Sequence, residues 1–531
     1  MDRKKSTSIS YSEVGMLSKI TRDYLANKET VKSFYDWDSN ASNIQKVIDE
    51  KSDFSLETRE ILVQVLTEQY VDLASPLVKK NMDLLLSRNT YTITTGHQLN
   101  LFTGPLYFIY KIVSAIQTAK LLSVEYPKMN FIPVYWMATE DHDFDEINHA
   151  FVGDKKIQWN SDQSGMVGEF SLDGIEAAVE EFCNALGDSL SAREMAELIR
   201  KAYLNQSNLA DATRFLVHEL FKDYGLVIVD ANNRKLKQLF APIVKRELKE
   251  QVSFRTVSNT LKEFGKTFSA QVSPREINLF YVKQGLRERI LKTEQGYLVN
   301  NSEITFDENQ MDLEIENHPE RFSPNVILRP VYEELILPNL VYIGGGAEVA
   351  YWLELKATFE AFNVPFPLVQ IRSSFLTLSP KSIDRIQELN WTTRDVYRKK
   401  QDLVMRFTND VNPLETKISE VKIKLNLELE KLGLSLTEYD SELERSLKAS
   451  QRGMEKSMDR LSKKVSGAVK RHNQDHMHKM DQVWDAVNPF GVYQERHVNF
   501  FEMYATYGTE FVNRIRTETE PFCKDFRVVE L

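Results

Sequence analysis

The stretch from residue 91 to residue 149 constrains the fold more than any other part of the chain. Two short runs rich in β-branched and aromatic residues, 91–95 and 131–136, enclose a segment, 106–124, whose apolar residues recur at helical spacing. This order is typical of a βαβ unit, in which both strands are parallel and end at the same edge of a sheet. The polar loop after the first strand and the acidic cluster after the second are therefore expected to meet across one crevice.

Strand-like and helix-like segments alternate through most of residues 90–385, within a core domain that we place at residues 1–390. Further apolar runs of strand length, separated by segments of helical periodicity, occur at 225–230, 278–283, 325–330, 341–344 and 367–372. Such alternation predicts an α/β fold with a doubly wound, mostly parallel sheet. Two stretches interrupt the alternation, a polar and helical one near 151–223 and one with short strands near 285–322. We interpret both as insertions between core strands.

Residues 391–480 have a different pattern. Apolar residues recur at three-, four- and seven-residue steps in two arms: Leu414, Ile418, Val421, Leu425 and Leu432, then Leu447, Met454, Met458, Leu461, Val465 and Ala468. This pattern predicts a long antiparallel coiled-coil hairpin with a turn at 433–439. Its narrow apolar seam would pack against its own partner arm or against a second subunit. The segment 481–531 breaks the heptads and is expected to return to the core.

Composition excludes several classes of function. The net charge of -10 argues against binding along a nucleic-acid backbone, so any anionic ligand must meet local Lys and Arg residues. The two cysteines, Cys183 and Cys523, have no neighbour at metal-binding spacing, which excludes a disulfide scaffold and a cysteine-rich zinc site. No apolar run has the length of a transmembrane helix. We therefore expect a cytoplasmic protein that binds neither nucleic acid nor membranes.

The loop after the first strand carries the first set of candidate binding residues: Gly96, His97, Gln98, Asn100 and Gly104. Glycine lets a ligand approach the backbone closely, and the helix start near Pro105 favours anions. The loop is therefore a candidate site for a phosphate or a carboxylate. The alternative is an ordinary strand-to-helix turn.

The cluster after the second strand carries the candidate catalytic residues, Glu140, Asp141, His142 and Asp143. Neighbouring carboxylates can raise one another's pKa and can orient an imidazole, which suits acid–base chemistry. Alternatively, Asp143 or Asp145 could simply cap the next helix. His142, Asp143 and His149 could also bind a metal, but we predict no dedicated metal site.

Two later motifs add candidate binding residues. Arg329 could hold a carboxylate through its bidentate guanidinium, or it could form a structural ion pair with Glu333 or Glu334. Gly344 and Gly345 follow a strand and precede a helix, where backbone N–H groups could cradle an anion. The glycine turn lacks the Lys-Ser/Thr of a Walker loop and the full dinucleotide fingerprint.

Taken in order, six motifs resemble those of the bacillithiol biosynthesis cysteine-adding enzymes, and they extend over nearly the whole chain. They are TGHQLN at 95–100, FTGPLY at 102–107, PVYWMATEDHD at 133–143 followed by Asn148 and His149, SPNVILRP at 323–330, YIGGGAE at 342–348 and QER at 494–496. The Glu-Asp-His-Asp block is the most specific of them.

The resemblance implies a Rossmann core with two insertions, a homodimer held by the coiled coil, and addition of L-cysteine to the amine of glucosaminyl-malate to form bacillithiol. It also adds Asn148 and Glu348 to the binding residues. The core is similar to class I aminoacyl-tRNA synthetases and related cysteine ligases, which bind ATP through a His-x-x-His loop. This similarity makes ATP, with Mg²⁺, a possible cofactor. The loop at 97–100 lacks the second histidine, so His97 is assigned to binding and not to acid–base chemistry.

Two other functions fit the same residues. One is a coiled-coil scaffold whose Rossmann core binds a nucleotide without catalysis. The other is an ATP-dependent ligase or nucleotidyltransferase that acts on a different amine.

Overall fold

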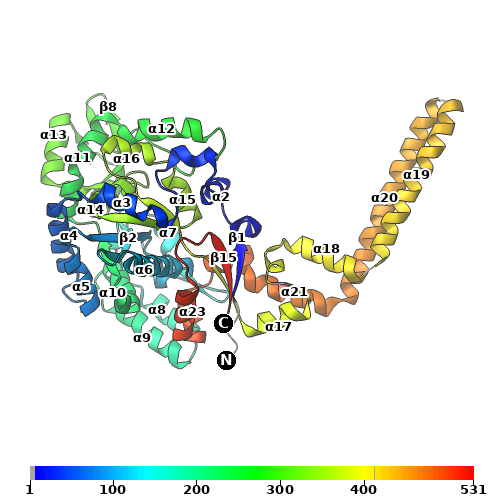
Figure 1. Cartoon of the computed structure of the whole chain (residues 1–531), viewed down its shortest axis with the longest axis horizontal. Coiled ribbons are helices and arrows are strands. Elements are labelled where there is room, and N and C mark those ends of the chain that lie inside the picture. Colours follow the sequence, from blue (N-terminus) through cyan, green and yellow to red (C-terminus); the bar gives the residue numbers. More distant parts are fainter. Residues whose placement is uncertain (1–5, 412, 440) are drawn as a thin grey trace. The chain divides into compact units, whose positions relative to one another are not determined.

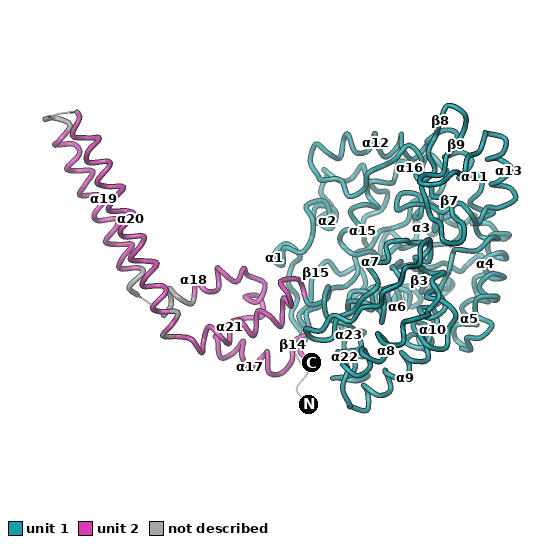
Figure 2. The backbone as a smooth tube through the Cα atoms, turned by 180° about the vertical axis from the view of Figure 1, so that it is seen from behind, with its two compact units in different colours: residues 1–376, 494–529, 531 teal, residues 377–493, 530 magenta. Residues whose placement is uncertain are grey.

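The computed structural model describes residues 6–411, 413–439 and 441–531, and the chain forms two compact units. Figure 2 shows them in two colours. The first consists of Met1–Leu376 with Gln494–Val529 and Leu531, and the second of Thr377–Tyr493 with Glu530. In the described part of the chain, no helix combines the length and apolar composition that a membrane span requires.

A five-stranded parallel sheet forms the centre of the first unit. Its strands are β2 (Thr90–His97), β3 (Asn130–Met137), β6 (Val227–Asp230), β12 (Asn339–Gly344) and β13 (Leu368–Ile371). Their spatial order is β13-β12-β2-β3-β6, and every neighbouring pair is parallel. Numbered along the chain, the order read from the β6 edge is 3-2-1-4-5, which is that of a Rossmann sheet. The predicted fold class is therefore confirmed.

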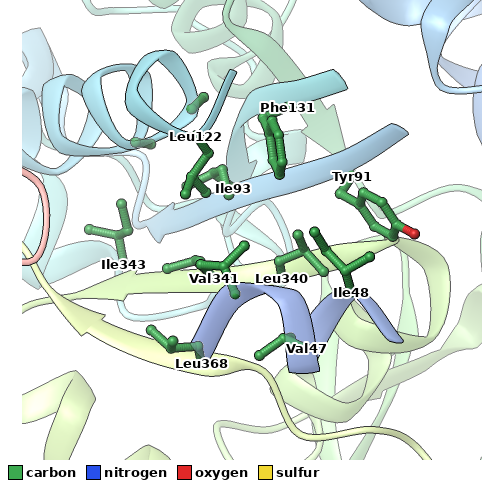
Figure 3. Close-up of a cluster of buried hydrophobic side chains, with 13 residues drawn as sticks. Val47, Ile48, Tyr91, Ile93, Leu122, Phe131, Leu340, Val341, Ile343 and Leu368 are labelled. Atoms are coloured by element: carbon green, nitrogen blue, oxygen red, sulfur yellow. The ribbon is translucent and has the colours of Figure 1, made fainter. Parts of the chain in front are cut away.

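The sheet is buried because apolar helices pack against it. Helix α6 (Tyr107–Glu125) connects β2 to β3 and contacts both strands, as the helical periodicity of that segment predicts. Helix α3 (Ile44–Lys51) contacts β12. Figure 3 shows part of the resulting core, in which side chains from these two helices meet side chains of the central strands.

The chain between β3 and β6 contains the first predicted insertion. It begins with a two-stranded hairpin, β4 (His149–Val152) and β5 (Lys155–Gln158). Three helices follow: α8 (Glu176–Ala185), α9 (Leu190–Leu204) and α10 (Leu209–Phe221). Helices α11 (Arg234–Glu250) and α12 (Val252–Phe264) come after β6.

A second, antiparallel sheet lies between α12 and β12 in sequence. Its strands are β7 (Leu279–Lys283), β8 (Leu286–Thr293), β9 (Gly296–Val299), β10 (Thr305–Phe306) and β11 (Phe322–Pro324), in the order β10-β9-β8-β7-β11. Helix α13 (Glu308–Asn317) connects β10 to β11. The apolar run at 278–283 therefore belongs to this sheet and not to the parallel one.

The strand predicted at 325–330 is wrong. A turn at 325–328 leads into helix α14 (Arg329–Ile336), which has Pro330 in its first turn. Proline at that position favours a helix start, because its missing N–H would have no partner there in any case. The Asn325 side chain accepts the Ile327 N–H at 2.9 Å and fixes the turn. Ile327 and Leu328 are buried, as they would be in a strand, and periodicity over so few residues does not distinguish a helix start from a strand.

The two ends of the first unit lie side by side. Strand β1 (Ser6–Ser10) pairs antiparallel with β15 (Asp525–Glu530), from Ser6 opposite Val529 to Ser10 opposite Asp525. Helices α22 (Phe500–Tyr507) and α23 (Thr509–Glu518) precede β15, and α22 packs on α9.

The second unit consists mainly of helices: α17 (Pro380–Glu388), α18 (Lys400–Val411), α19 (Pro413–Tyr439), α20 (Ser441–His472) and α21 (Gln474–Val487). Figure 1 shows α19 and α20 side by side along their length. Lys422 bonds Asp459 at 2.8 Å and Asn426 bonds Glu455 at 3.2 Å, which sets an antiparallel register. The predicted helical hairpin is therefore confirmed.

The turn predicted at 433–439 is wrong, because helix α19 continues to Tyr439 and α20 begins at Ser441. Gly433 lies inside the helix, where a Cβ atom would come within 3.2 Å of the Leu447 side chain. This glycine therefore serves close packing between the arms and not a turn. The side chain of Leu414, the first predicted seam residue, lies outside the described part.

Candidate active site

A cleft of about 760 Å³ opens at the carboxyl ends of β2 and β3, and Tyr342 of β12 also lines it. The strand order of the sheet reverses between the neighbouring strands β2 and β12. Open α/β sheets bind ligands at such a reversal point. The volume is in the range of ligand sites in proteins. The cleft is therefore the candidate active site of the first unit.

Most of the residues predicted from sequence line this cleft. They are Gly96, His97, Gln98, Glu140, Asp141, His142, Asp143, Arg329 and Glu348. Both polar segments of the predicted βαβ unit follow parallel strands, so they meet at one edge of the sheet as the sequence predicts.

The remaining predicted residues lie outside the cleft lining and have other contacts. Gly104 has φ +62°, and its carbonyl accepts the Asn499 amide at 2.9 Å. Asn100 lines a separate cavity the size of one water molecule. The Asn148 carbonyl accepts the Trp159 N–H at 2.8 Å and holds the β4–β5 hairpin. A ligand-binding role for these three residues stays a prediction.

The glycine turn after β12 supports Glu348, which projects from helix α15 (Gly346–Trp352). A Cβ atom on Gly344 would come within 2.9 Å of the Glu348 Cβ, so only glycine fits there without a shift. The Gly345 N–H donates to Glu348 Oε2 at 2.8 Å, so this carboxylate already occupies that donor. Neither glycine lines the cleft. Anion binding by these two backbone groups likewise stays a prediction.

Sequence reasoning missed Lys111, the partner of Glu348. Its Nζ lies 2.7 Å from Glu348 Oε2 and also donates to the Gly96 carbonyl. Burial lowers the pKa of Lys111, and the nearby Glu348 carboxylate offsets part of that effect. Burial acts to raise the pKa of Glu348, but Lys111 and hydrogen bonds from Gly345 and Tyr342 outweigh it and lower that pKa. This contact ties α6 to α15. The signal for Lys111 in the sequence is a charge surrounded by apolar residues near the start of the segment 106–124, whose other lysine, Lys120, is exposed.

Arg329 forms the ion pair with Glu333 that sequence reasoning considered as the alternative to a carboxylate clamp. Its Nη1 lies 2.6 Å from Glu333 Oε2, and its Nη2 donates to Tyr351 at 3.3 Å. The guanidinium also lies over the rings of Trp136 and Tyr342. Burial raises the pKa of Glu333 to about 7, with Arg329 opposing that shift. Because Arg329 also lines the cleft, the ion pair does not exclude contact with a ligand.

The acidic cluster is fixed by Gln98 and by the backbone that follows it. Gln98 Nε2 donates to Asp141 Oδ2 at 2.9 Å, and Asp141 Oδ1 accepts the His142 N–H at 2.7 Å. Glu140 forms an ion pair with the buried Lys237 of α11. Asp143 precedes the short helix α7 (Phe144–Ile147), but its side chain accepts no capping hydrogen bond from the described residues. The Asp143 side chain therefore does not cap this helix.

His142 reaches the second sheet, because its Nδ1 lies 2.5 Å from Nη1 of Arg287 in β8. The ligand atoms of Asp141, His142 and Asp143 lie within 4.8 Å of one another, close enough to hold a metal ion. His142 and Asp143 are exposed, and exposed acidic groups are often arranged in this way without a metal. The cluster does not by itself identify a metal site.

His97 also lines the cleft, and its ring lies 5.2 Å from that of Tyr107 and 5.0 Å from that of Phe108, measured between ring centroids. Burial, together with the nearby cations Lys111 and Arg372, holds the pKa of His97 well below its usual value. The imidazole is therefore neutral at pH 7. Its Nε2 atom is buried and has no hydrogen-bond partner among the residues that the structure describes. A binding role, as predicted, suits a neutral ring better than acid–base chemistry at neutral pH.

The QER motif at 494–496 has a structural role in the same unit. Glu495 accepts two hydrogen bonds from Arg372, at 2.9 and 2.5 Å, and both side chains are buried. The Arg372 guanidinium lies over the ring of Tyr107 at the start of α6. The motif therefore attaches the C-terminal segment beside β13 and the candidate site.

Sequence reasoning also missed the cleft residues of the second sheet and its preceding loop. They are Ser273, Arg275, Phe280, Arg287 and Arg289. They lie in or beside the segment interpreted as the second insertion, whose function could not be read from the sequence. Arginines at alternating positions of β8 were the available signal, because alternate residues of a strand share one face.

Comparison with known proteins agrees with this fold. The model of the BshC N-terminal Rossmann-like domain of bacillithiol biosynthesis matches residues 5–373, and that of the BshC C-terminal coiled-coil domain matches residues 375–531. Relatives named "Putative cysteine ligase BshC" from Flavobacterium johnsoniae and Flavobacterium psychrophilum are each 42% identical over 98% of this chain and 99% of their own. The relative of that name from Christiangramia forsetii is 38% identical over 98% of both chains. The chain therefore belongs to the BshC family of bacillithiol biosynthesis proteins.

Proposed function

We propose that the protein is a carbon–nitrogen ligase that adds L-cysteine to the amine of glucosaminyl-malate and so forms bacillithiol. Family membership and the names of the relatives support a cysteine ligase. The observation that carries the proposal is the cleft itself, in which the acidic cluster and several arginines meet at the reversal point of a Rossmann sheet. Such a site can hold an amine and carboxylates together.

The reaction needs an activated carboxyl group and an unprotonated amine. We propose that ATP supplies the activation, so that a phosphate-linked group leaves with one carboxyl oxygen of cysteine as the amine nitrogen attacks the carboxyl carbon. The nitrogen then loses a proton to a base. Asp141 and Asp143 are the candidates for binding the ammonium group and accepting that proton, since both line the cleft and Gln98 orients Asp141.

The residues near the end of β2 suit the activated carboxyl group and a nucleotide. Gly96, the Gln98 amide and the Arg329 guanidinium line the cleft near the end of β2. A cation and backbone donors at a strand end stabilise negative charge that develops on oxygen. Mg²⁺ would arrive with the nucleotide phosphates, because Mg²⁺ in such sites is held largely by the substrate.

The test is to incubate the purified protein with cysteine and glucosaminyl-malate, with and without ATP, and to measure bacillithiol by mass spectrometry. Product is expected only with ATP. The Asp141→Asn and Asp143→Asn variants should each lower kcat, by about 100-fold for the residue that acts as the base. Asp162→Asn, at an exposed position outside the cleft, should change neither product yield nor folding.

The rival functions predict different results. Nucleotide binding without any product would favour the non-catalytic scaffold. Amide formation with a different amino acceptor, and none with glucosaminyl-malate, would favour a ligase of other specificity. Product in the absence of ATP would overturn nucleotide activation while leaving the ligase intact. Full activity in both aspartate variants would remove the acid–base assignment.

A further inference from the structure

The cationic side chains of the cleft differ in how far their charge is compensated. Lys111 lies 2.7 Å from Glu348, and Arg329 lies 2.6 Å from Glu333. Both cations at the β2 side of the cleft are thus paired with a carboxylate. A ligand that binds there meets fixed donors but little net positive charge.

The second sheet and its preceding loop provide the uncompensated charge. Within residues 6–411, 413–439 and 441–531, the guanidinium groups of Arg275 and Arg289 form no hydrogen bond and no ion pair, although both side chains line the cleft. Arg287, by contrast, has hydrogen-bond partners: its Nη1 lies 2.5 Å from His142 Nδ1, and its Nε donates to Ser323 Oγ at 3.3 Å. The excess positive charge of the cleft therefore lies at Arg275 and Arg289.

The β7–β8 hairpin explains why Arg287 and Arg289 face the same way. They are two residues apart on β8, and Arg289 lies opposite Phe280 of β7 in the antiparallel register. Alternate residues of a strand and directly paired residues share one face. The Arg287 guanidinium stacks on the Phe280 ring, with its carbon 3.9 Å from the ring centroid. This stacking fixes Arg287 and leaves Arg289 as its free neighbour.

The loop that carries Arg275 is held from both ends. The Arg275 N–H donates to Asn278 Oδ1 at 3.1 Å, and the Asn278 amide donates to the Arg275 carbonyl at 2.9 Å. Earlier in the loop, the buried Glu354 accepts the N–H groups of Gln271 and Val272, at 2.7 and 3.1 Å. The backbone at Arg275 is thus fixed while its guanidinium stays available. A fixed backbone lowers the entropy lost on binding.

We infer that Arg275 and Arg289 form the subsite that binds the malyl dicarboxylate of the amino-sugar substrate, an inference that rests on the proposed function. Malate carries two carboxylates that the reaction leaves unchanged, whereas the single carboxylate of cysteine is consumed. Two uncompensated guanidinium groups match two carboxylates in charge and in bidentate geometry. Polyphosphate has the same anionic chemistry, so the test must separate the two ligands.

The test compares Arg275→Gln, Arg289→Gln and the double variant with the wild-type protein in steady-state kinetics. Each single variant should raise the KM for glucosaminyl-malate about 10-fold, and the double variant about 100-fold, because a charged hydrogen bond contributes roughly one order of magnitude in affinity. The KM values for ATP and for cysteine should stay within about 2-fold. Arg→Lys at either position should restore part of the loss. Arg193→Gln, at an exposed position of α9 outside the cleft, serves as the matched control.

A binding measurement keeps the inference separate from the proposed function. By calorimetry, wild-type protein should bind glucosaminyl-malate more tightly than methyl glucosaminide, and the double variant should lose that preference. The outcome of this binding measurement does not depend on whether the protein makes bacillithiol. Equal affinity of the wild-type protein for the two sugars would overturn the inference. A raised KM for ATP with an unchanged KM for glucosaminyl-malate would assign the arginines to phosphate and also overturn it.

Discussion

At the scale of single residues, the candidate site is built on charged side chains that are paired before any ligand binds. Lys111 and Glu348 are the clearest case, because Lys111 is 3% exposed and its ammonium group also holds the Gly96 carbonyl. Breaking such a buried pair leaves one charge without compensation, which costs more than the pair contributes. These residues are therefore expected to serve folding as well as the geometry of the cleft.

We predict that Lys111→Met lowers the free energy of unfolding by about 1–3 kcal/mol, because the Glu348 side chain, which is only 23% exposed, would lose its counterion. Urea denaturation followed by circular dichroism measures the change. The double variant Lys111→Met/Glu348→Gln should recover at least about 1 kcal/mol of that loss, because the uncompensated charge is removed. Lys120→Met, at an exposed position of the same helix, is the control. A single variant as stable as the wild type would contradict the proposed role of the pair.

At the scale of elements, the loop from β2 to α6 determines where Gly96, His97 and Gln98 lie. Gly104 ends a short turn with φ +62° and ψ -151°, a conformation that is essentially confined to glycine. A Cβ atom there would also come within 2.7 Å of the Asn100 Cβ. The glycine that sequence reasoning assigned to ligand binding thus has a clear conformational role.

We predict that Gly104→Ala lowers the free energy of unfolding by about 1–3 kcal/mol and also lowers turnover, because the strained loop displaces His97 and Gln98. Thermal denaturation and the bacillithiol assay measure the two effects. Gly453→Ala is the matched control, since Gly453 lies inside α20 and a Cβ atom would meet no described atom within 4 Å. The control should gain about 1 kcal/mol in stability, as alanine does in helices. If Gly104→Ala leaves both quantities unchanged, the conformational argument is wrong.

At the scale of the whole molecule, the helical hairpin leaves apolar side chains uncovered. Large apolar residues of α19 and α20 are exposed in the single chain: Val421, Ile423, Leu427, Leu432, Leu434, Leu443, Met454 and Leu461. Exposed apolar residues on one element are a common sign of a protein interface. We therefore propose that the hairpin joins two copies of the chain, which is one of the two alternatives for the narrow seam and the one that the family resemblance implies.

The prediction is that the full chain is a dimer and that a variant with 413–472 replaced by a short Gly/Ser linker is a monomer. Light scattering coupled to size-exclusion chromatography measures both masses. Circular dichroism and the bacillithiol assay show whether the first unit of the shortened chain stays folded. A folded, shortened chain that is still dimeric would place the interface elsewhere.

Much of the architecture was predictable because it depends on local pattern. The parallel strands are apolar runs of strand length, and the hairpin arms repeat apolar residues at coiled-coil spacing. The errors have local causes too: the run at 325–330 is a turn and a helix start, and Gly433 is a packing glycine inside a helix. In both places a short sequence signal was compatible with two structures, and packing selected one.

The sequence by itself determined the Rossmann class, the helical hairpin and the polar segments of the cleft, because parallel strands bring the residues that follow them to one edge. Only the tertiary structure decided which charged side chains of the cleft are paired and which are not. Lys111 and Glu348 are far apart in the chain, as are His142 and Arg287, and their pairing depends on packed elements. Lys111 and Arg287 have partners that are far away in the sequence, whereas the guanidinium groups of Arg275 and Arg289 have none among the described residues. This difference arises only when the chain folds, so the sequence alone does not predict it.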